Sequence, residues 1–199
     1  MDESLAKVRH DRSQKDFPML RLEEDEYVEI ALSRARICLL AILGGTALGV
    51  IVILLVFLFI LMGQETIDEM GRNFMFIMLV ALLGVAIISG LIALKVYRGN
   101  KLFVTNRRVF QLLTTSLVSS SMNVIDLPSI EDASFHQDGI LPRMFHYGTL
   151  RLATVGDETT YTFKYSDVKP EQVDHISRLV TEAKEALRKK QLAELNGSN

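Results

Sequence analysis

The sequence has little cysteine and little proline, and its charge is nearly balanced. It contains one cysteine, Cys38, and four prolines in 199 residues, with a formal net charge of −2. A single cysteine excludes an internal disulfide, a cysteine zinc cluster and a redox pair. The basic excess typical of nucleic-acid-binding proteins is also absent. We therefore expect no nucleic-acid partner.

Two long stretches contain no Asp, Glu, Lys, Arg or His: residues 37–62 and residues 74–94. A helix of about 26 residues is about 39 Å long, against about 30 Å for the hydrocarbon core of a bilayer. The pattern predicts two transmembrane helices, which together form a hairpin over residues 37–94. Because neither helix carries Asp, Glu, Lys, Arg or His, we expect no ion path or transport site inside the membrane.

Lysine and arginine gather at one end of this predicted hairpin. Arg34 and Arg36 precede it, and Lys95 and Arg98 follow it, whereas the connecting loop has a single arginine. The positive-inside rule then places both termini in the cytoplasm. The charged start of the chain does not look like a secretory signal peptide. We expect a multi-pass protein of the inner (plasma) membrane.

The part before the hairpin divides into two segments. Residues 1–21 are mostly polar and are predicted to form a mobile cytoplasmic lead. Residues 22–36 form a juxtamembrane segment that we expect to dock against the later domain. Its apolar residues fit a strand or a helix equally well, so the pattern leaves this choice open.

The part after the hairpin, residues 95–195, is predicted to form one small cytoplasmic domain. Alternating apolar residues predict antiparallel strands, with a turn at Asn106 and a break at Pro128. From Pro170 the apolar spacing becomes helical. The fold class is membrane α+β: a two-helix transmembrane hairpin followed by a small antiparallel β-barrel capped by a C-terminal α-helix. The predicted strands cover residues 101–105, 108–114, 122–127, 130–136, 149–155 and 160–165.

Three stretches resemble the bacterial PH-like (pleckstrin-homology-like) membrane proteins, a family formerly labelled as a domain of unknown function. They are Phe103-Val-Thr-Asn-Arg-Arg-Val109, Ile125-Asp-Leu-Pro-Ser-Ile-Glu-Asp-Ala133 and Gly139-Ile-Leu-Pro-Arg-Met-Phe-His-Tyr-Gly-Thr-Leu-Arg-Leu152. The resemblance covers about residues 22–190. It implies a seven-strand PH-type barrel with a capping helix. It does not imply one ligand, because this fold serves lipid, peptide and protein binders alike.

Small residues recur at helical spacing in both predicted spans. They are Ala41, Gly45 and Gly49 in the first span and Ala86 and Gly90 in the second. Such faces allow two helix backbones to approach closely. The contact they predict lies either within the hairpin or between two protomers.

Three basic residues are the candidate binding residues: Lys101, Arg107 and Arg108. We expect them near the membrane exit of the second span, where arginine would pair with a lipid phosphate or with a partner. The alternative is structural, with one arginine paired to Glu131 or Asp132.

Catalytic and metal sites are not expected. The serines of residues 116–121 lack the flanking glycines of a nucleophile elbow. The best metal cluster, Glu131, Asp132, His136 and Asp138, also fits the polar face of a solvated strand. We expect no cofactor and no small-molecule substrate.

The sequence therefore predicts a non-catalytic membrane-anchored module that mediates protein interaction or self-assembly at the cytoplasmic face of the membrane. Its partners would be membrane lipid and either a second copy of the chain or another envelope protein. The alternative function is the sensing of anionic lipid headgroups through the basic first hairpin of the domain.

Overall fold

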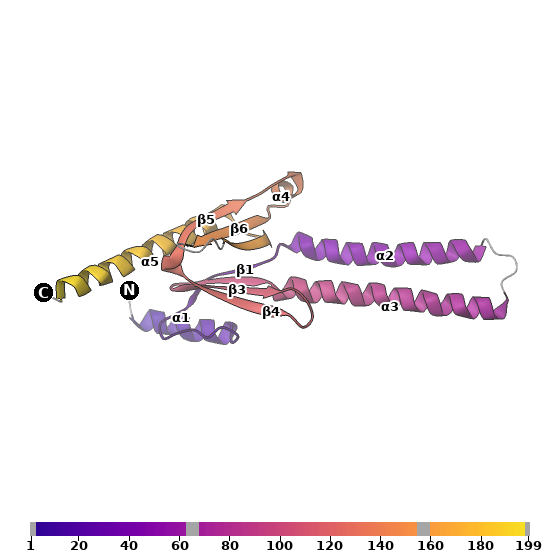
Figure 1. The fold of residues 1–199 in the computed structure, drawn as a ribbon, viewed down its shortest axis with the longest axis horizontal. Coiled ribbons are helices and arrows are strands. Elements are labelled where there is room, and N and C mark those ends of the chain that lie inside the picture. Colours follow the sequence, from indigo (N-terminus) through magenta and orange to yellow (C-terminus); the bar gives the residue numbers. More distant parts are fainter. Residues whose placement is uncertain (1–2, 63–67, 155–159, 198–199) are drawn as a thin grey trace.

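The computed structural model describes residues 3–62, 68–154 and 160–197, which form an elongated molecule (Figure 1). A two-helix hairpin occupies one half, and a β-domain with both chain ends occupies the other. In chain order the elements are α1 (Glu3–Asp16), β1 (Val28–Ser33), α2 (Arg36–Met62), α3 (Glu69–Gly99), β2 (Lys101–Thr105), β3 (Arg108–Thr114), β4 (Ser120–Asp126), the short 3-10 helix η1 (Leu127–Ser129), β5 (Ile130–His136), α4 (Ile140–Met144), β6 (Gly148–Thr154), β7 (Thr160–Ser166) and α5 (Pro170–Gly197).

The β-domain consists of two antiparallel sheets. One has the order β1-β2-β3-β4 and the other has the order β5-β6-β7. Apolar side chains from both sheets and from α5 form one core, in which Val104, Leu127 and Ile176 are fully buried. Gln111 is also buried inside, and its Nε2 donates to the Thr162 carbonyl at 2.9 Å, which ties β3 to β7.

The predicted strands, the turn at Asn106 and the C-terminal helix are confirmed. Pro128 interrupts the sheet inside η1, as expected of a residue without an amide hydrogen. Part of the predicted loop between the helices, and residue 155 at the end of the predicted strand 149–155, fall outside the described residues.

The domain boundary at residue 95 is corrected, because the first strand comes from before the hairpin. β1 pairs with β2 through Ile30–Val104 and Leu32–Leu102. The juxtamembrane segment, residues 22–36, for which the sequence fits a strand or a helix equally well, therefore forms a strand over Val28–Ser33. The hairpin α2–α3 is an insertion between two neighbouring strands of one sheet, and both of its helices enter and leave the domain at the same end. We call this the hairpin end; the opposite end, with the β2–β3 turn, is the far end (Figure 1).

The expectation of a mobile N-terminal lead is also corrected. Residues 3–16 form α1, and the Val28 amide donates to Ser13 Oγ at 3.0 Å. Leu20 is 1% exposed, and the Phe17 ring lies 4.9 Å from the Phe103 ring. The reason is physical: the outer face of the four-stranded sheet is apolar, and the N-terminal segment removes it from water.

The two helices of the hairpin contain no buried residue, and both are long and apolar enough to cross a membrane. The predicted second span, residues 74–94, lies inside the longer α3, whose N-terminus is capped by Asp68 through the Gly71 amide.

One of the predicted small residues lies in the contact between the helices. A Cβ added to Gly90 would lie 2.7 Å from Thr46 Oγ1, whereas a Cβ on Gly45 or Gly49 would meet no atom within 4 Å. Ala41 is exposed and Ala86 is half-buried. The structure therefore brings Gly90 into the hairpin contact and leaves Ala41 and Gly45 on the outward side of α2.

Candidate functional site: a groove at the far end

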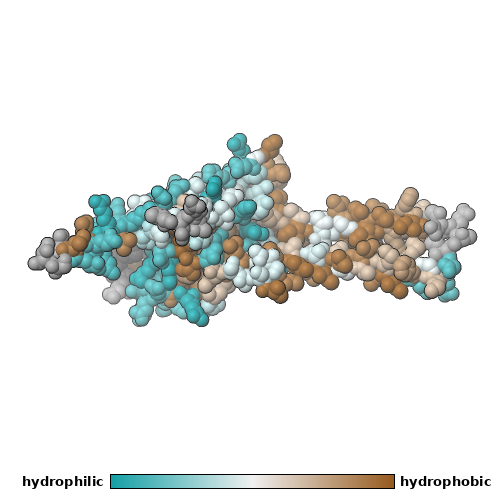
Figure 2. Space-filling view, in the orientation of Figure 1, coloured by the Kyte–Doolittle hydropathy of each residue, from teal (hydrophilic) through white to brown (hydrophobic). Residues whose placement is uncertain are grey.

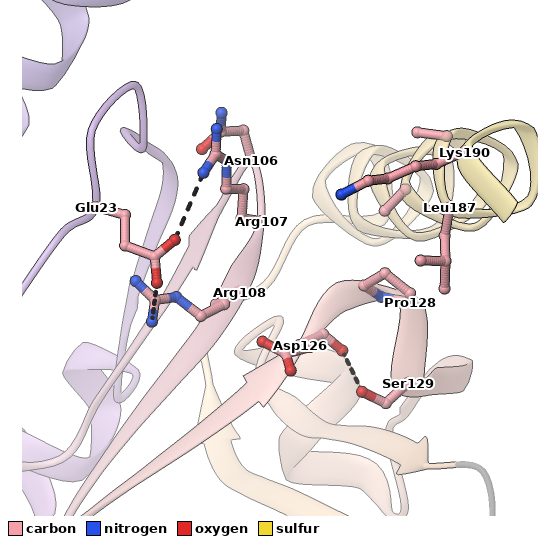
Figure 3. A pocket seen from close by; sticks show the side chains of 11 residues that line it. Glu23, Asn106, Arg107, Arg108, Asp126, Pro128, Ser129, Leu187 and Lys190 are labelled. Carbon is pink, nitrogen blue, oxygen red and sulfur yellow. Dashed lines mark hydrogen bonds and ion pairs between the residues drawn. The ribbon is translucent and has the colours of Figure 1, made fainter. Parts of the chain in front are cut away.

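A groove of about 870 Å³ opens at the far end, between the β2–β3 turn and α5 (Figure 3). One wall is charged, with Arg107 and Asp126 on it. The other wall is largely apolar, with Leu187 of α5 beside Pro128 of η1, and Lys190 of α5 also lines it. Such a combination can hold a segment that is apolar on one side and polar on the other. The full lining is Glu23, Asn106, Arg107, Arg108, Asp126, Pro128, Ser129, Ala183, Ala186, Leu187 and Lys190.

The turn that builds the charged wall is held by the segment preceding β1. Asn106 Oδ1 accepts from the Tyr27 amide at 3.2 Å, and its Nδ2 donates to the Asp25 carbonyl at 3.0 Å. Thr105 Oγ1 accepts from the Arg108 amide at 2.8 Å and closes the turn. The Thr-Asn-Arg-Arg stretch is therefore a tight turn bound to the segment just before β1, which is remote in the sequence.

A buried carboxylate lies behind this turn. Glu26 is fully buried, and its Oε1 accepts from Thr105 Oγ1 at 2.7 Å and from Arg108 Nε at 3.2 Å. Its Oε2 accepts from the Glu23 amide at 2.9 Å and from Arg108 Nη2. Charge and hydrogen bonds thus compensate the carboxylate for its loss of water, as a buried charge requires.

The environment of Glu26 lowers the pKa of its carboxyl group. Burial raises this pKa, but the hydrogen bonds from Arg108, from the Glu23 amide and from Thr105 outweigh the burial. The same contact with Glu26 raises the pKa of Arg108. Both groups are therefore charged at neutral pH, and the pair is a fixed structural element.

The three predicted basic residues are not brought together. Lys101 begins β2 at the hairpin end, whereas Arg107 and Arg108 lie beyond the other end of this five-residue strand. At about 3.3 Å per residue the strand separates them by about 17 Å. The expectation that all three lie near the exit of the second span is wrong, since β2 carries the chain away from α3.

The acidic partners of the two arginines also differ from those that the sequence suggests. Arg108 pairs with Glu26 and, at 3.1 Å, with Glu23, and Arg107 lies 3.5 Å from Glu23. The alternative pairing of an arginine with Glu131 or Asp132 is wrong, because the acidic partners are Glu23 and Glu26. Sequence reasoning missed Glu26; its signal was the acidic run of residues 23–26 just before the first strand.

The side chains that line the groove offer ionic, hydrogen-bonding and apolar contacts. Its lining contains no histidine or cysteine, and its one hydroxyl, Ser129 Oγ, donates to the Asp126 carbonyl at 2.9 Å. Elsewhere in the described ranges, no group of three His, Cys, Asp or Glu residues could hold a metal ion.

Comparison with known proteins gives a family and a distant structural likeness. Residues 38–184 match the family model described as "Bacterial PH domain". A DUF1696 family protein with a pleckstrin-homology domain from Shewanella loihica PV-4 is similar in its crystal structure. The two chains are 15% identical, the match covers 43% of this chain and 70% of that chain, and the TM-score is 0.31. No curated protein matches the chain.

Proposed function

The chain belongs to the bacterial PH domain family, and on this premise we propose that it is a non-catalytic, membrane-anchored module that docks a protein segment in the far-end groove, at the cytoplasmic face of a membrane. The docked segment belongs to another envelope protein or to a second copy of the chain. The carrying observation is the insertion of the hairpin between the paired strands β1 and β2.

This insertion supports anchoring without a flexible linker. Only Arg34 and Ala35 separate β1 from α2, and Asn100 alone separates α3 from β2. Asn100 is 2% exposed, and its Nδ2 donates to the Val96 carbonyl at 2.5 Å and to the Thr114 carbonyl at 2.9 Å. A hairpin fixed in this way would hold the β-domain in one orientation and present the far end to the cytoplasm.

The direction of the hairpin follows from its flanking charges. Basic residues lie at the domain side of both helices, while the described start of α3 has Asp68 and Glu69 beside Arg72. By the positive-inside rule the β-domain is cytoplasmic. The side with the basic residues is marked by Arg34, Arg36, Lys95, Arg98 and Lys101.

The two walls of the groove favour a protein segment over a lipid headgroup. Arg108 is neutralised by Glu26, and Arg107 has Glu23 beside it, so two of the three basic side chains that line the groove already have an acidic partner. Leu187 and Pro128 offer apolar contact opposite these charges. The distance of Arg107 and Arg108 from the hairpin end argues further against anionic-lipid sensing by these residues.

Photo-crosslinking in native membranes tests the docking. A photoreactive residue at Leu187 should give a crosslinked product, whereas the same residue at the exposed position Arg151, on the other sheet, should not. Lys190→Glu and Arg107→Glu should weaken the product at Leu187. A product of twice the mass of the chain identifies self-assembly, and equal crosslinking at the two positions would refute the groove as the docking site.

A further inference from the structure

The hairpin end carries apolar side chains that the protein leaves uncovered. Val118, in the β3–β4 loop, is 97% exposed, and its neighbour Leu117 is 47% exposed. On α4, between β5 and β6, Ile140 is 83% exposed, and Leu141 and Met144 are each 58% exposed. Figure 2 shows brown surface continuing from the hairpin onto the adjoining part of the β-domain.

Hydrogen bonds locate the β3–β4 loop at the start of the hairpin. Lys95 Nζ, near the end of α3, donates to the Leu117 carbonyl at 3.1 Å. Lys95 directly follows the uncharged stretch of α3, so Leu117 lies at the level where that stretch ends.

A second chain of contacts locates α4 at the same level. Arg34, two residues before α2, bridges to Ser166, which pairs with Gly148 of β6. The α4 segment immediately precedes Gly148. In Figure 1 the α4 segment and the β3–β4 loop lie on opposite sides of the point where the hairpin leaves the domain.

The α4 segment has a defined shape, which keeps its apolar residues turned outward. The Phe145 amide donates to the Leu141 carbonyl at 2.9 Å, and the Tyr147 amide donates to the Pro142 carbonyl at 3.1 Å. Gly148 has to be glycine, because a Cβ there would overlap the Phe135 ring and the His136 carbonyl. The exposed apolar side chains are thus presented by a folded element.

We infer that the β3–β4 loop and α4 insert their apolar side chains into the interfacial layer of the membrane, on either side of the hairpin. This inference rests on the proposed function, because it requires the hairpin to span the membrane. The ligand is the lipid surface itself. The two loops lie at the level where the lipid-exposed helices begin, and an apolar patch continuous with a membrane anchor is covered by the same membrane.

The surrounding charges fit this contact. Lys95 contacts the β3–β4 loop and Arg143 belongs to α4 itself, so both basic side chains lie next to the proposed inserting residues, where they would reach lipid phosphates. Asp138 is the acidic residue nearest to α4 in the sequence and is exposed to solvent, whereas Asp126, the one nearest to the β3–β4 loop in the sequence, lies in the groove at the far end. Leu117, Val118, Ile140, Leu141, Met144 and Phe145 form the proposed inserting set.

The test uses the full chain with Cys38→Ser, in nanodiscs of phosphatidylcholine and phosphatidylglycerol that contain nitroxide-labelled lipid. A fluorescent probe is attached in turn to Val118→Cys, Ile140→Cys, Val85→Cys in mid-hairpin and Leu192→Cys on the exposed far part of α5. We expect the probes at positions 118 and 140 to lose most of their fluorescence to a shallow nitroxide, while the probe at position 192 keeps its fluorescence.

Each other outcome is decisive. If the probe at position 85 is quenched by a deep nitroxide but those at 118 and 140 remain as bright as at 192, the loops do not touch lipid, and membrane anchoring still stands. Quenching at only one of the two loops refutes the two-sided contact. A blue-shifted but unquenched probe at 118 or 140 shows a protein cover in place of lipid and refutes the inference. If the probe at position 85 is not quenched by the deep nitroxide, both the membrane anchor and the loop insertion are refuted.

Discussion

At the hairpin end of the β-domain two loops expose large apolar side chains, whereas at the far end the β2–β3 turn exposes charged ones. Val118 and Ile140 are examples at the hairpin end, and Arg107 and Glu23 are examples at the far end. The same strands connect both ends, so this contrast arises from the loops and turns and not from the sheets. Under the proposed function, one end of this two-sheet domain would face lipid and the other a protein partner.

The interior between the two ends is the shared element on which both depend, and disrupting it should have the largest effect. Ile176 of α5 is fully buried in the core, whereas Leu192 of the same helix is 51% exposed. Ile176→Ala should destabilise the folded domain by about 2–5 kcal/mol, because it removes buried methyl groups and leaves a cavity.

The matched control is Leu192→Ala, which should change stability by no more than about 0.5 kcal/mol. The measurement is chemical denaturation of the full chain in detergent, in which the protease resistance of the β-domain reports how much of it remains folded. Equal effects of the two substitutions would show that α5 does not pack as described.

The far end should depend on its buried carboxylate. Glu26→Gln leaves Arg108 with only the exposed Glu23, and breaking a buried ion pair costs about 3–5 kcal/mol, so a loss near 3 kcal/mol is expected. Glu23→Gln is the control: its side chain is 58% exposed, and the cost should stay below about 1 kcal/mol. Similar losses for both variants in denaturant titrations would contradict the role given to Glu26.

Substitutions at Gly90, which lies in the contact between α2 and α3, and at Gly45, which lies outside it, should affect stability differently. Gly90→Leu pushes a side chain into Thr46, and overpacking of this kind costs about 1–3 kcal/mol. Gly45→Leu points into open space and should leave the thermal midpoint in detergent unchanged. If mass photometry in nanodiscs then shows that Gly45→Leu weakens oligomers, the outward face of α2 joins protomers; a lower midpoint for Gly45→Leu would refute the helix arrangement.

Acid should weaken the far end selectively. Because the folded-state pKa of Glu26 is lowered, its stabilisation is fully present above the unfolded value of about 4.3. It is lost as the pH falls through the lower folded-state value. Wild type should therefore lose stability below about pH 4.3 more steeply than Glu26→Gln, as followed by thermal midpoints across the acid range. Parallel pH profiles for the two proteins would contradict this assignment.

The sequence predicted the local parts of this molecule well and its long-range contacts poorly. The β2–β3 turn and the C-terminal helix follow from spacing and turn residues, which are local signals. Thr105 donates a hydrogen bond to Glu26, which is 79 positions away in the sequence. The helical and strand periodicity of apolar residues carries no information about such a contact. For the same reason β1 was not assigned to the domain, although its strand pattern was recognised as one of two alternatives.

The candidate site shows the same limit. Because Arg107 and Arg108 are basic and follow a predicted span, the sequence predicts them near the membrane, but a single five-residue strand carries them to the opposite end of the domain. The apolar wall from Leu187 and Pro128 was not foreseen, since each residue is ordinary in its own segment. Only the packing of α5 beside η1 brings them together.

The central claim is that the hairpin crosses the membrane and holds the β-domain on its cytoplasmic side. The most direct measurement is labelling of single cysteines in intact cells with a membrane-impermeant maleimide, using Met70→Cys at the start of α3, and Arg151→Cys and Glu182→Cys in the β-domain, each with Cys38→Ser. All three positions are exposed to solvent in the structure, and none lies in the loops proposed to touch lipid. The account predicts labelling at position 70 in intact cells and at positions 151 and 182 only after the cells are opened. Labelling of position 151 or 182 in intact cells, or protection of position 70, would contradict it.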